Sequence, residues 1–287
     1  MYYSLIILST IMFGICFALN KSYVKVCGDG VKQSFEYSLV SNIVAMIALI
    51  IINGFKWEFT WFTLIMALIC TVNGYLFTIC SFKALGKINL SVFSVYSMLG
   101  GMLLPFLQGI IFYGEEITVA KVLCVIFIII ALTLTIKKGD KSNGMIYYIG
   151  VFTFNGMSGV ISKIFNTAPF ERTSAEAYSI MCCALSVIIS FIIISTVFKS
   201  TEKKKGNWLK TVMYGGISGV TNRVANLLLL IALLHVDTSV QYPMVTGGVM
   251  IVSVIINFFG ENKPSKRELC SVAMAFLGML ALFFVKF

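Results

Sequence analysis

Apolar residues fill ten long segments of this 287-residue sequence, and short polar stretches separate them. Each segment is close to the roughly 20 residues that an α-helix needs to cross the hydrocarbon core of a bilayer. The pattern therefore predicts an all-α polytopic membrane protein with ten transmembrane helices. They are expected at residues 2–24, 34–53, 59–82, 88–113, 118–136, 145–165, 175–198, 208–234, 237–259 and 268–285.

One block of the sequence occurs twice, as an internal repeat. The stretch from Ala84 to Cys124 recurs from Ala232 to Cys270, 148 residues later before a glycine pair and 146 residues later after it. The matching positions include Ala84-Leu85 with Ala232-Leu233, Ser91-Val92 with Ser239-Val240, Gly100-Gly101 with Gly247-Gly248, and Gly114-Glu115 with Gly260-Glu261. A match of this length indicates internal duplication.

The duplication divides the chain into two five-helix repeats, residues 1–138 and 145–287, joined by a polar hinge at 139–144. Because five is odd, the two repeats must cross the membrane in opposite directions, which predicts an inverted repeat. A weaker match outside this block supports the division, since Gly14 and Lys21 recur 142 residues later as Gly156 and Lys163.

Composition narrows the class of protein. With 59% hydrophobic and 12% charged residues, the chain carries more apolar surface than a soluble domain can enclose. Its net charge of +10 does not indicate a nucleic-acid partner, because the lysines occur in short runs between apolar segments. We expect no metal, no cofactor and no enzymatic activity, since the eight cysteines lack C-x-x-C spacing and no nucleophile has a matching base.

Basic residues are distributed unevenly between the two ends of the expected bundle. One set of connectors carries fourteen lysines and arginines, and the other carries only Lys56, Lys121, Arg172 and Lys286. The positive-inside rule then places both termini outside the cytosol, in a multi-pass protein of the cell (inner) membrane.

The duplicated residues resemble the drug/metabolite transporter superfamily, specifically its ten-helix, EamA-like branch, over essentially the whole chain. The resemblance is carried by the Ala-Leu pairs that end the third and eighth segments, the serine-rich starts of the next segments, and the Gly-Glu pairs that follow. It implies a secondary transporter that works by alternating access around a cavity lined mainly by helices 1, 3, 4, 6, 8 and 9. Many relatives keep both ends in the cytosol, whereas the charge distribution favours the opposite orientation.

The eighth segment holds the most informative polar cluster: Asn222, Arg223 and Asn226. Spacings of three and four place them on one helical face, and Arg223 lies roughly 22 Å along the axis from Trp208, near mid-membrane. An arginine at that depth costs about 2.5 to 3.5 kcal/mol, so it should face the bundle interior or water. Arg223 is therefore the predicted binding site for a carboxylate or phosphate of the substrate. The alternative is that Arg223 forms a structural ion pair with an acidic residue inside the bundle.

Other polar residues are weaker candidates. For substrate binding they are Asn73, Tyr96, Gln241 and Tyr242, on helices that the resemblance assigns to the cavity. For coupling they are Glu36, Glu176, Lys21 and Lys163. The lysines could instead reach the interface from nearby helix ends, and the acids could simply stabilise helix starts. The pairs Gly100-Gly101 and Gly247-Gly248 are expected to allow close helix packing.

These observations favour a secondary transporter of a small organic solute, an amino acid or another carboxylate metabolite, with export expected and proton coupling left open. The expected partners are the solute and the lipid bilayer, and the chain is expected to act as a monomer, with a homodimer as the alternative. A flippase for a phosphate-bearing carrier lipid is a second hypothesis, which a lateral opening between helices would favour. A multidrug exporter is disfavoured, because the first segment contains no acidic residue.

Overall fold

The computed structural model describes residues 2–114, 117–135, 144–198, 208–233, 238–260 and 263–284, without the side chains at 227, 230, 233, 238–243 and 282–284. Ten α-helices and no strand form within these segments. They are α1 (Tyr2–Cys27), α2 (Val31–Ile52), α3 (Trp61–Leu85), α4 (Leu90–Tyr113), α5 (Val119–Thr135), α6 (Met145–Thr167), α7 (Ala175–Thr196), α8 (Trp208–Leu233), α9 (Thr238–Phe259) and α10 (Lys266–Phe284). The all-helical class is confirmed, and each helix lies close to the expected position.

Six of the helices, α1, α2, α3, α4, α6 and α7, are long and apolar enough to cross a membrane. Helix α5 and residues Met244–Phe259 of α9 are also apolar but shorter. The chain is therefore a membrane protein by the length and composition of its helices.

Local signals fix several helix ends. The Thr60 hydroxyl accepts a hydrogen bond from the Thr63 amide at 3.2 Å, which caps the start of α3. Ser174 caps α7 in the same way, through the Ala177 amide. Such caps satisfy amides that have no partner in the first helical turn. Helix α4 ends at Gly114, which has a φ of +66°, a left-handed conformation that glycine adopts without a Cβ penalty.

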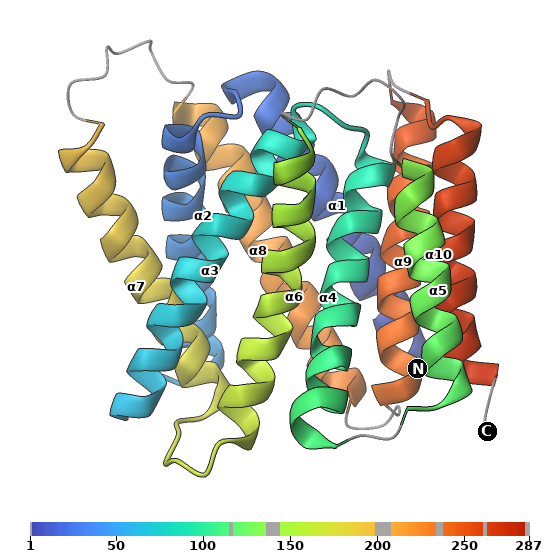
Figure 1. Ribbon diagram of the computed structural model, residues 1–287. Coiled ribbons are helices and arrows are strands. Elements are labelled where there is room, and N and C mark those ends of the chain that lie inside the picture. The colour runs from blue at the N-terminus through green and yellow to red at the C-terminus, as the bar shows by residue number, and fades with distance from the viewer. Residues whose placement is uncertain are drawn as a thin grey trace.

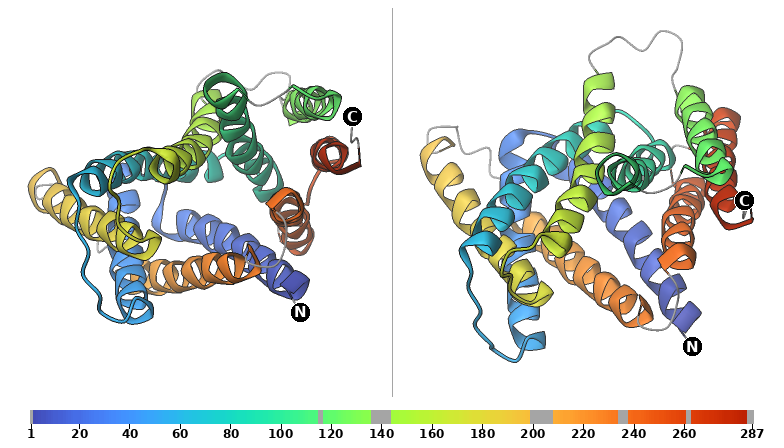
Figure 2. Two further views of the ribbon diagram at one scale, coloured as in Figure 1. Left: turned by 90° about the horizontal axis from the view of Figure 1, so that it is seen from below. Right: turned by 60° about the horizontal axis from the view of Figure 1, so that its bottom comes forward.

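Helices far apart in the sequence lie side by side (Figure 1). Helix α1 packs against α8 and α9, α6 packs against α3 and α4, and α5 packs against α10. Seen from below, α1 and α8 form one side, α3 and α6 form the other, and α7 lies at the edge opposite α5 and α10 (Figure 2). Helices α1 and α6 run in opposite directions, and α1 begins at the same end of the bundle at which α10 ends (Figure 1).

Glycines allow two of these helix pairs to approach closely. Where α4 crosses α6, a Cβ added to Gly100 would lie 2.6 Å from the carbonyl carbon of Phe152, and one on Gly156 would lie 2.5 Å from the carbonyl oxygen of Gly100. Where α1 crosses α9, a Cβ on Gly248 would overlap Thr10 Cγ2. The neighbours of the remaining paired glycines are Asn155 at Gly101 and Phe276 at Gly247.

Aromatic side chains hold the last turns of α1 in place. The completely buried Tyr23 ring has its centroid 4.9 Å from that of Tyr37 on α2 and 5.4 Å from that of Phe82 on α3. One turn and a half earlier, the Phe17 ring meets Phe93 of α4 edge to face at 5.1 Å. Such pairs contribute about 0.5 to 1.5 kcal/mol each beyond the area they bury. They position the cavity described next.

Candidate functional site

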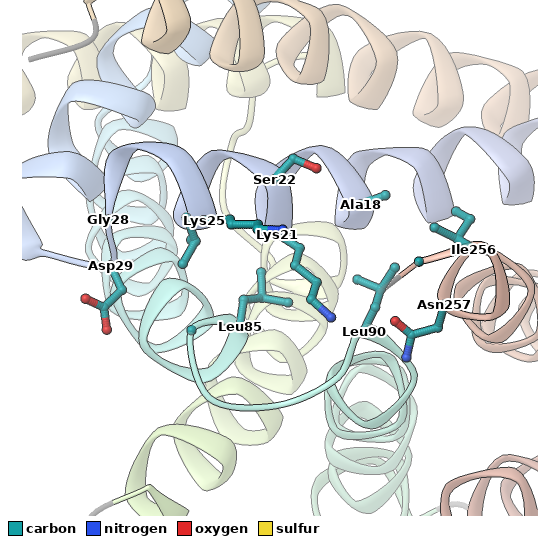
Figure 3. A pocket seen from close by; sticks show the side chains of 13 residues that line it. Ala18, Lys21, Ser22, Lys25, Gly28, Asp29, Leu85, Leu90, Ile256 and Asn257 are labelled. Atoms are coloured by element: carbon teal, nitrogen blue, oxygen red, sulfur yellow. The ribbon is translucent and has the colours of Figure 1, made fainter. Parts of the chain in front are cut away.

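A cavity of about 680 Å³ lies at the end of the bundle where α1 and α3 end and α4 begins (Figure 3). We call it the α1–α9 cavity. Its walls come from α1, α3, α4, α9 and the turns beside them, and the lining residues are Ala18, Lys21, Ser22, Val24, Lys25, Gly28, Asp29, Leu85, Gly86, Leu90, Ile256, Asn257 and Gly260.

Lys21 is the charged side chain that reaches across this cavity. Its ammonium group extends from α1 toward Leu90 and Asn257 (Figure 3). The residue is half-buried, and no carboxylate among the described residues forms a salt bridge with it. At the rim, the Asp29 carboxylate lies 3.5 Å from Lys83 Nζ, so its charge is already compensated. The cavity therefore presents a net positive wall.

Polar side chains anchor the start of α4, which forms the far wall. Asn257, only 4% exposed, donates a hydrogen bond from Nδ2 to Ser91 Oγ at 2.9 Å. Behind it, Asn89 Nδ2 lies 3.1 and 3.2 Å from the two carboxylate oxygens of Glu268. Glu268, 3% exposed, also accepts from the Ser265 amide and attracts Lys21 electrostatically. These bonds tie α4 to α9 and α10 beside the cavity.

Tyr96 lies behind that wall, in a smaller pocket of about 110 Å³ that Glu268 and Tyr148 also line. Its hydroxyl accepts a hydrogen bond from Thr135 Oγ1 at 2.9 Å, which joins α4 to α5. The structure thus places this candidate next to the α1–α9 cavity but not among its lining residues.

Arg223 lies elsewhere, in a pocket of about 120 Å³ between α2, α7 and α8 that Glu176 and Asn226 also line. We call it the Arg223 pocket. The guanidinium donates from Nη2 to the sulfur of Cys183 at 3.2 Å. Asn226 Nδ2 donates to the carbonyl oxygen and the side-chain oxygen of Asn222, at 2.7 and 3.1 Å. The polar cluster of the eighth segment therefore stays together on α8, and the structure places Glu176 beside it.

Asn73 joins two helices. It is buried on α3, and its Nδ2 donates to the carbonyl oxygen of Phe154 at 2.9 Å and to Ser158 Oγ at 3.0 Å, both on α6. The side chains of Gln241 and Tyr242 lie outside the described residues, as do Glu115 and Glu261.

The remaining coupling candidates lie near helix ends. Glu36 Oε1 is 4.0 Å from Lys32 Nζ, one turn earlier on α2. Lys163 Nζ lies 4.6 Å from the centre of the Tyr113 ring, a cation–π contact. Lys21 and Lys163 match in the sequence, but their surroundings differ. Lys21 lines the α1–α9 cavity, whereas Lys163 lies over the ring of Tyr113.

Asn257 and Glu268 are polar residues that the sequence reasoning did not single out. A signal existed for Glu268, because Ser265-x-x-Glu268 before an apolar run is a capping box, and the Glu268 amide indeed donates to Ser265 Oγ at 3.3 Å. For Asn257 the only signal was an amide side chain within an apolar segment.

No protein-family model matches the chain, and no curated protein matches it. Among solved structures, 28 chains match. One, described as a crystal structure of a protein, superposes with a TM-score of 0.56 over 97% of this chain and 99% of its own, at 14% sequence identity. The ten-helix arrangement therefore occurs in a solved protein of nearly the same extent, and at this identity the likeness concerns the fold alone.

The arrangement can hold a small polar molecule inside an apolar bundle. The α1–α9 cavity offers a cation, an amide and a hydroxyl within apolar walls, which is typical of sites for small organic ligands.

Proposed function

We propose that the chain is a secondary transporter that moves a small organic solute, an amino acid or another carboxylate metabolite, across a membrane. The observation that carries the proposal is the α1–α9 cavity, about 680 Å³ in volume, whose positive wall lies within a bundle of apolar helices. Charged groups are expensive in such a bundle, so a half-buried lysine facing a cavity indicates a path for a polar solute.

The packing of the glycines supports an inverted repeat of two five-helix units, which gives such a transporter its two alternating openings. At the α1–α9 crossing, Gly248 faces Thr10 and Gly14 faces Val252; at the α4–α6 crossing, Gly100 faces Phe152 and Gly156 faces Leu104. Positions 14 and 156, like 10 and 152, are 142 residues apart; positions 100 and 248, like 104 and 252, are 148 apart. The two crossings therefore have the same spacing of contacts, although Gly248, and not its sequence match Gly247, takes the place that Gly100 has at the other crossing.

The same correspondence supports ten membrane-spanning helices, with 1–138 and 145–287 as the two units and 139–144 as the hinge. Helix α1 begins and helix α10 ends at the end of the bundle opposite the α1–α9 cavity (Figure 1). With the more basic connectors in the cytosol, the cavity then faces the cytosol, the side from which an exporter loads its solute. A tag at the carboxyl terminus that reacts only after cells are permeabilised would contradict this orientation.

Transport in liposomes tests the proposal. The purified full-length protein is reconstituted and assayed for uptake of labelled amino acids, hydroxy acids, simple carboxylates and lipophilic cations. We expect uptake of at least one acid above that of empty liposomes. Uptake of none of these solutes would contradict the transport function.

A pair of matched variants links transport to the cavity. Ala18 of α1 lines the cavity, so Ala18→Trp should fill it and abolish uptake. Ile7, on the same helix, is 54% exposed, so Ile7→Trp should leave uptake unchanged. Full uptake by purified, monodisperse Ala18→Trp would show that the solute does not pass through this cavity.

A further inference from the structure

We propose that Lys21 binds the anionic group of the solute, and that Asn257 selects solutes that also carry a hydrogen-bond donor beside that group. The substrate class is then an amino acid or a hydroxy acid. This inference rests on the transport function proposed above and names the contacts and the class of molecule at its site.

The charge of the α1–α9 cavity is the first argument. Three ionisable side chains line it: Lys21, Lys25 and Asp29. Asp29 pairs with Lys83 at 3.5 Å, and Lys21 forms no salt bridge among the described residues, so the wall around Lys21 is positive. An anion is attracted to this wall and a cation is repelled.

Lys21 also differs from two other cations within the helices, which already have contacts. Arg223 donates to Cys183, and Lys163 lies against the ring of Tyr113. Glu268 attracts Lys21, but its carboxylate is engaged by Asn89 and the Ser265 amide instead. A half-buried ammonium group without a salt bridge among the described residues is completed by a bound carboxylate, which supplies a charge-assisted hydrogen bond.

Asn257 supplies the second contact. Its Nδ2 donates to Ser91 Oγ at 2.9 Å, and this bond turns the side-chain oxygen into the cavity, toward the Lys21 ammonium group (Figure 3). An amide oxygen accepts but does not donate. It therefore favours a solute with an N–H or O–H group close to the carboxylate, as in an α-amino or α-hydroxy acid, over a simple carboxylate of the same size.

Binding to the purified full-length protein in detergent tests both contacts by calorimetry. The probes are alanine, lactate, propionate and tetraphenylphosphonium. We expect the wild type to bind alanine or lactate more tightly than propionate and not to bind the cation. Lys21→Gln should weaken binding of the acids at least about tenfold, equivalent to about 1.4 kcal/mol. Lys21→Arg, which keeps the charge, should restore most of it.

Two further variants complete the design. Asn257→Ala should remove the preference for alanine or lactate over propionate and leave propionate binding unchanged. Lys163→Gln is the matched control, because it is the same substitution at the equivalent position of the second repeat, and it should bind like the wild type. Should Lys21→Gln not purify as a monodisperse protein, Lys21→Arg and Asn257→Ala carry the test.

Each outcome separates the inference from the transport function. Lys21→Gln that binds acids with wild-type affinity, or Asn257→Ala that keeps the full preference, overturns the inference while transport stands. A wild type that binds only the cation overturns it as well. A wild type that neither binds nor transports any of the solutes overturns the transport function itself.

Discussion

The two glycine crossings, α4–α6 and α1–α9, are built differently. At the α4–α6 crossing, glycine faces backbone: the neighbours of Gly100 are the carbonyl and Cα atoms of Phe152. At the α1–α9 crossing, glycine faces side chains: Gly248 faces Thr10, and Gly14 faces Val252. A side chain can change rotamer, whereas a helix backbone cannot move without its neighbours.

The difference indicates which of the two crossings can adjust. The α1–α9 cavity lies one to two turns beyond the α1–α9 crossing, with Ala18 and Lys21 on α1 and Ile256 and Asn257 on α9. The solute site thus adjoins the crossing with movable neighbours, while the α4–α6 crossing is fixed by backbone contact. We expect transport to involve movement of α1 against α9 more than movement of α4 against α6.

The largest expected effect is at the fixed crossing. Gly100→Ala should destabilise the protein by about 3 kcal/mol, since the new methyl group meets backbone atoms that cannot yield. The measurement is SDS unfolding in mixed micelles. Gly74→Ala on α3, where a Cβ meets no atom within 4 Å, is the control and should be neutral or slightly stabilising. Equal stability of the two variants would show that α4 and α6 are not in backbone contact.

A smaller effect is expected where hydrogen bonds join the halves. Asn73→Ala removes two bonds between α3 and α6 and should cost about 1.5 kcal/mol, near the upper end for such bonds in membranes. Ser9→Ala removes one bond, to the Ala225 carbonyl oxygen, from the equivalent pair α1 and α8, and should cost about 0.5 kcal/mol. The same unfolding assay applies, and the reverse order would contradict the view that the α3–α6 side is the more firmly fastened.

The adjustable crossing gives an effect that can be reversed. Gly248→Ala should cost about 1 kcal/mol, because its methyl group displaces Thr10 Cγ2. The double variant Gly248→Ala/Thr10→Ser should regain most of that stability, since serine lacks the methyl group and keeps the hydroxyl that donates to the Ile6 carbonyl oxygen at 2.7 Å. If the double variant is no more stable than Gly248→Ala, the α1–α9 crossing is as rigid as the α4–α6 crossing.

The sequence was sufficient to predict the helices, because apolar length and intervening polar residues determine which segments can be helices in lipid. It gives the position of Arg223 along α8, which follows from the rise per residue, and the depth of Arg223 in a membrane stays a prediction. It could not show which neighbours that side chain meets. That depends on how α2, α7 and α8 pack, and the structure places Arg223 beside Cys183 rather than in the α1–α9 cavity.

Lys21 and Lys163 illustrate the same gap. They match in the predicted duplication, but Lys21 lines the α1–α9 cavity, whereas Lys163 Nζ lies 4.6 Å from the centre of the Tyr113 ring. The sequence did not single out Asn257 and Glu268 for a related reason, because each forms its hydrogen bond with a residue that is distant in the chain. Asn257 bonds to Ser91, and Glu268 bonds to Asn89. Such pairs become visible only when α4, α9 and α10 are placed together.

The interlocking of the halves has a consequence for how the protein is made. When the ribosome has completed the first five helices, Asn73 and Ser9 still lack the partners that α6 and α8 will bring. Until α6 and α8 are made, these polar groups lie in lipid without those hydrogen bonds, so we expect the first five helices alone to be less stable than the complete protein. Two fragments divided at the hinge and synthesised together should protect one another from degradation, whereas either one made alone should be short-lived.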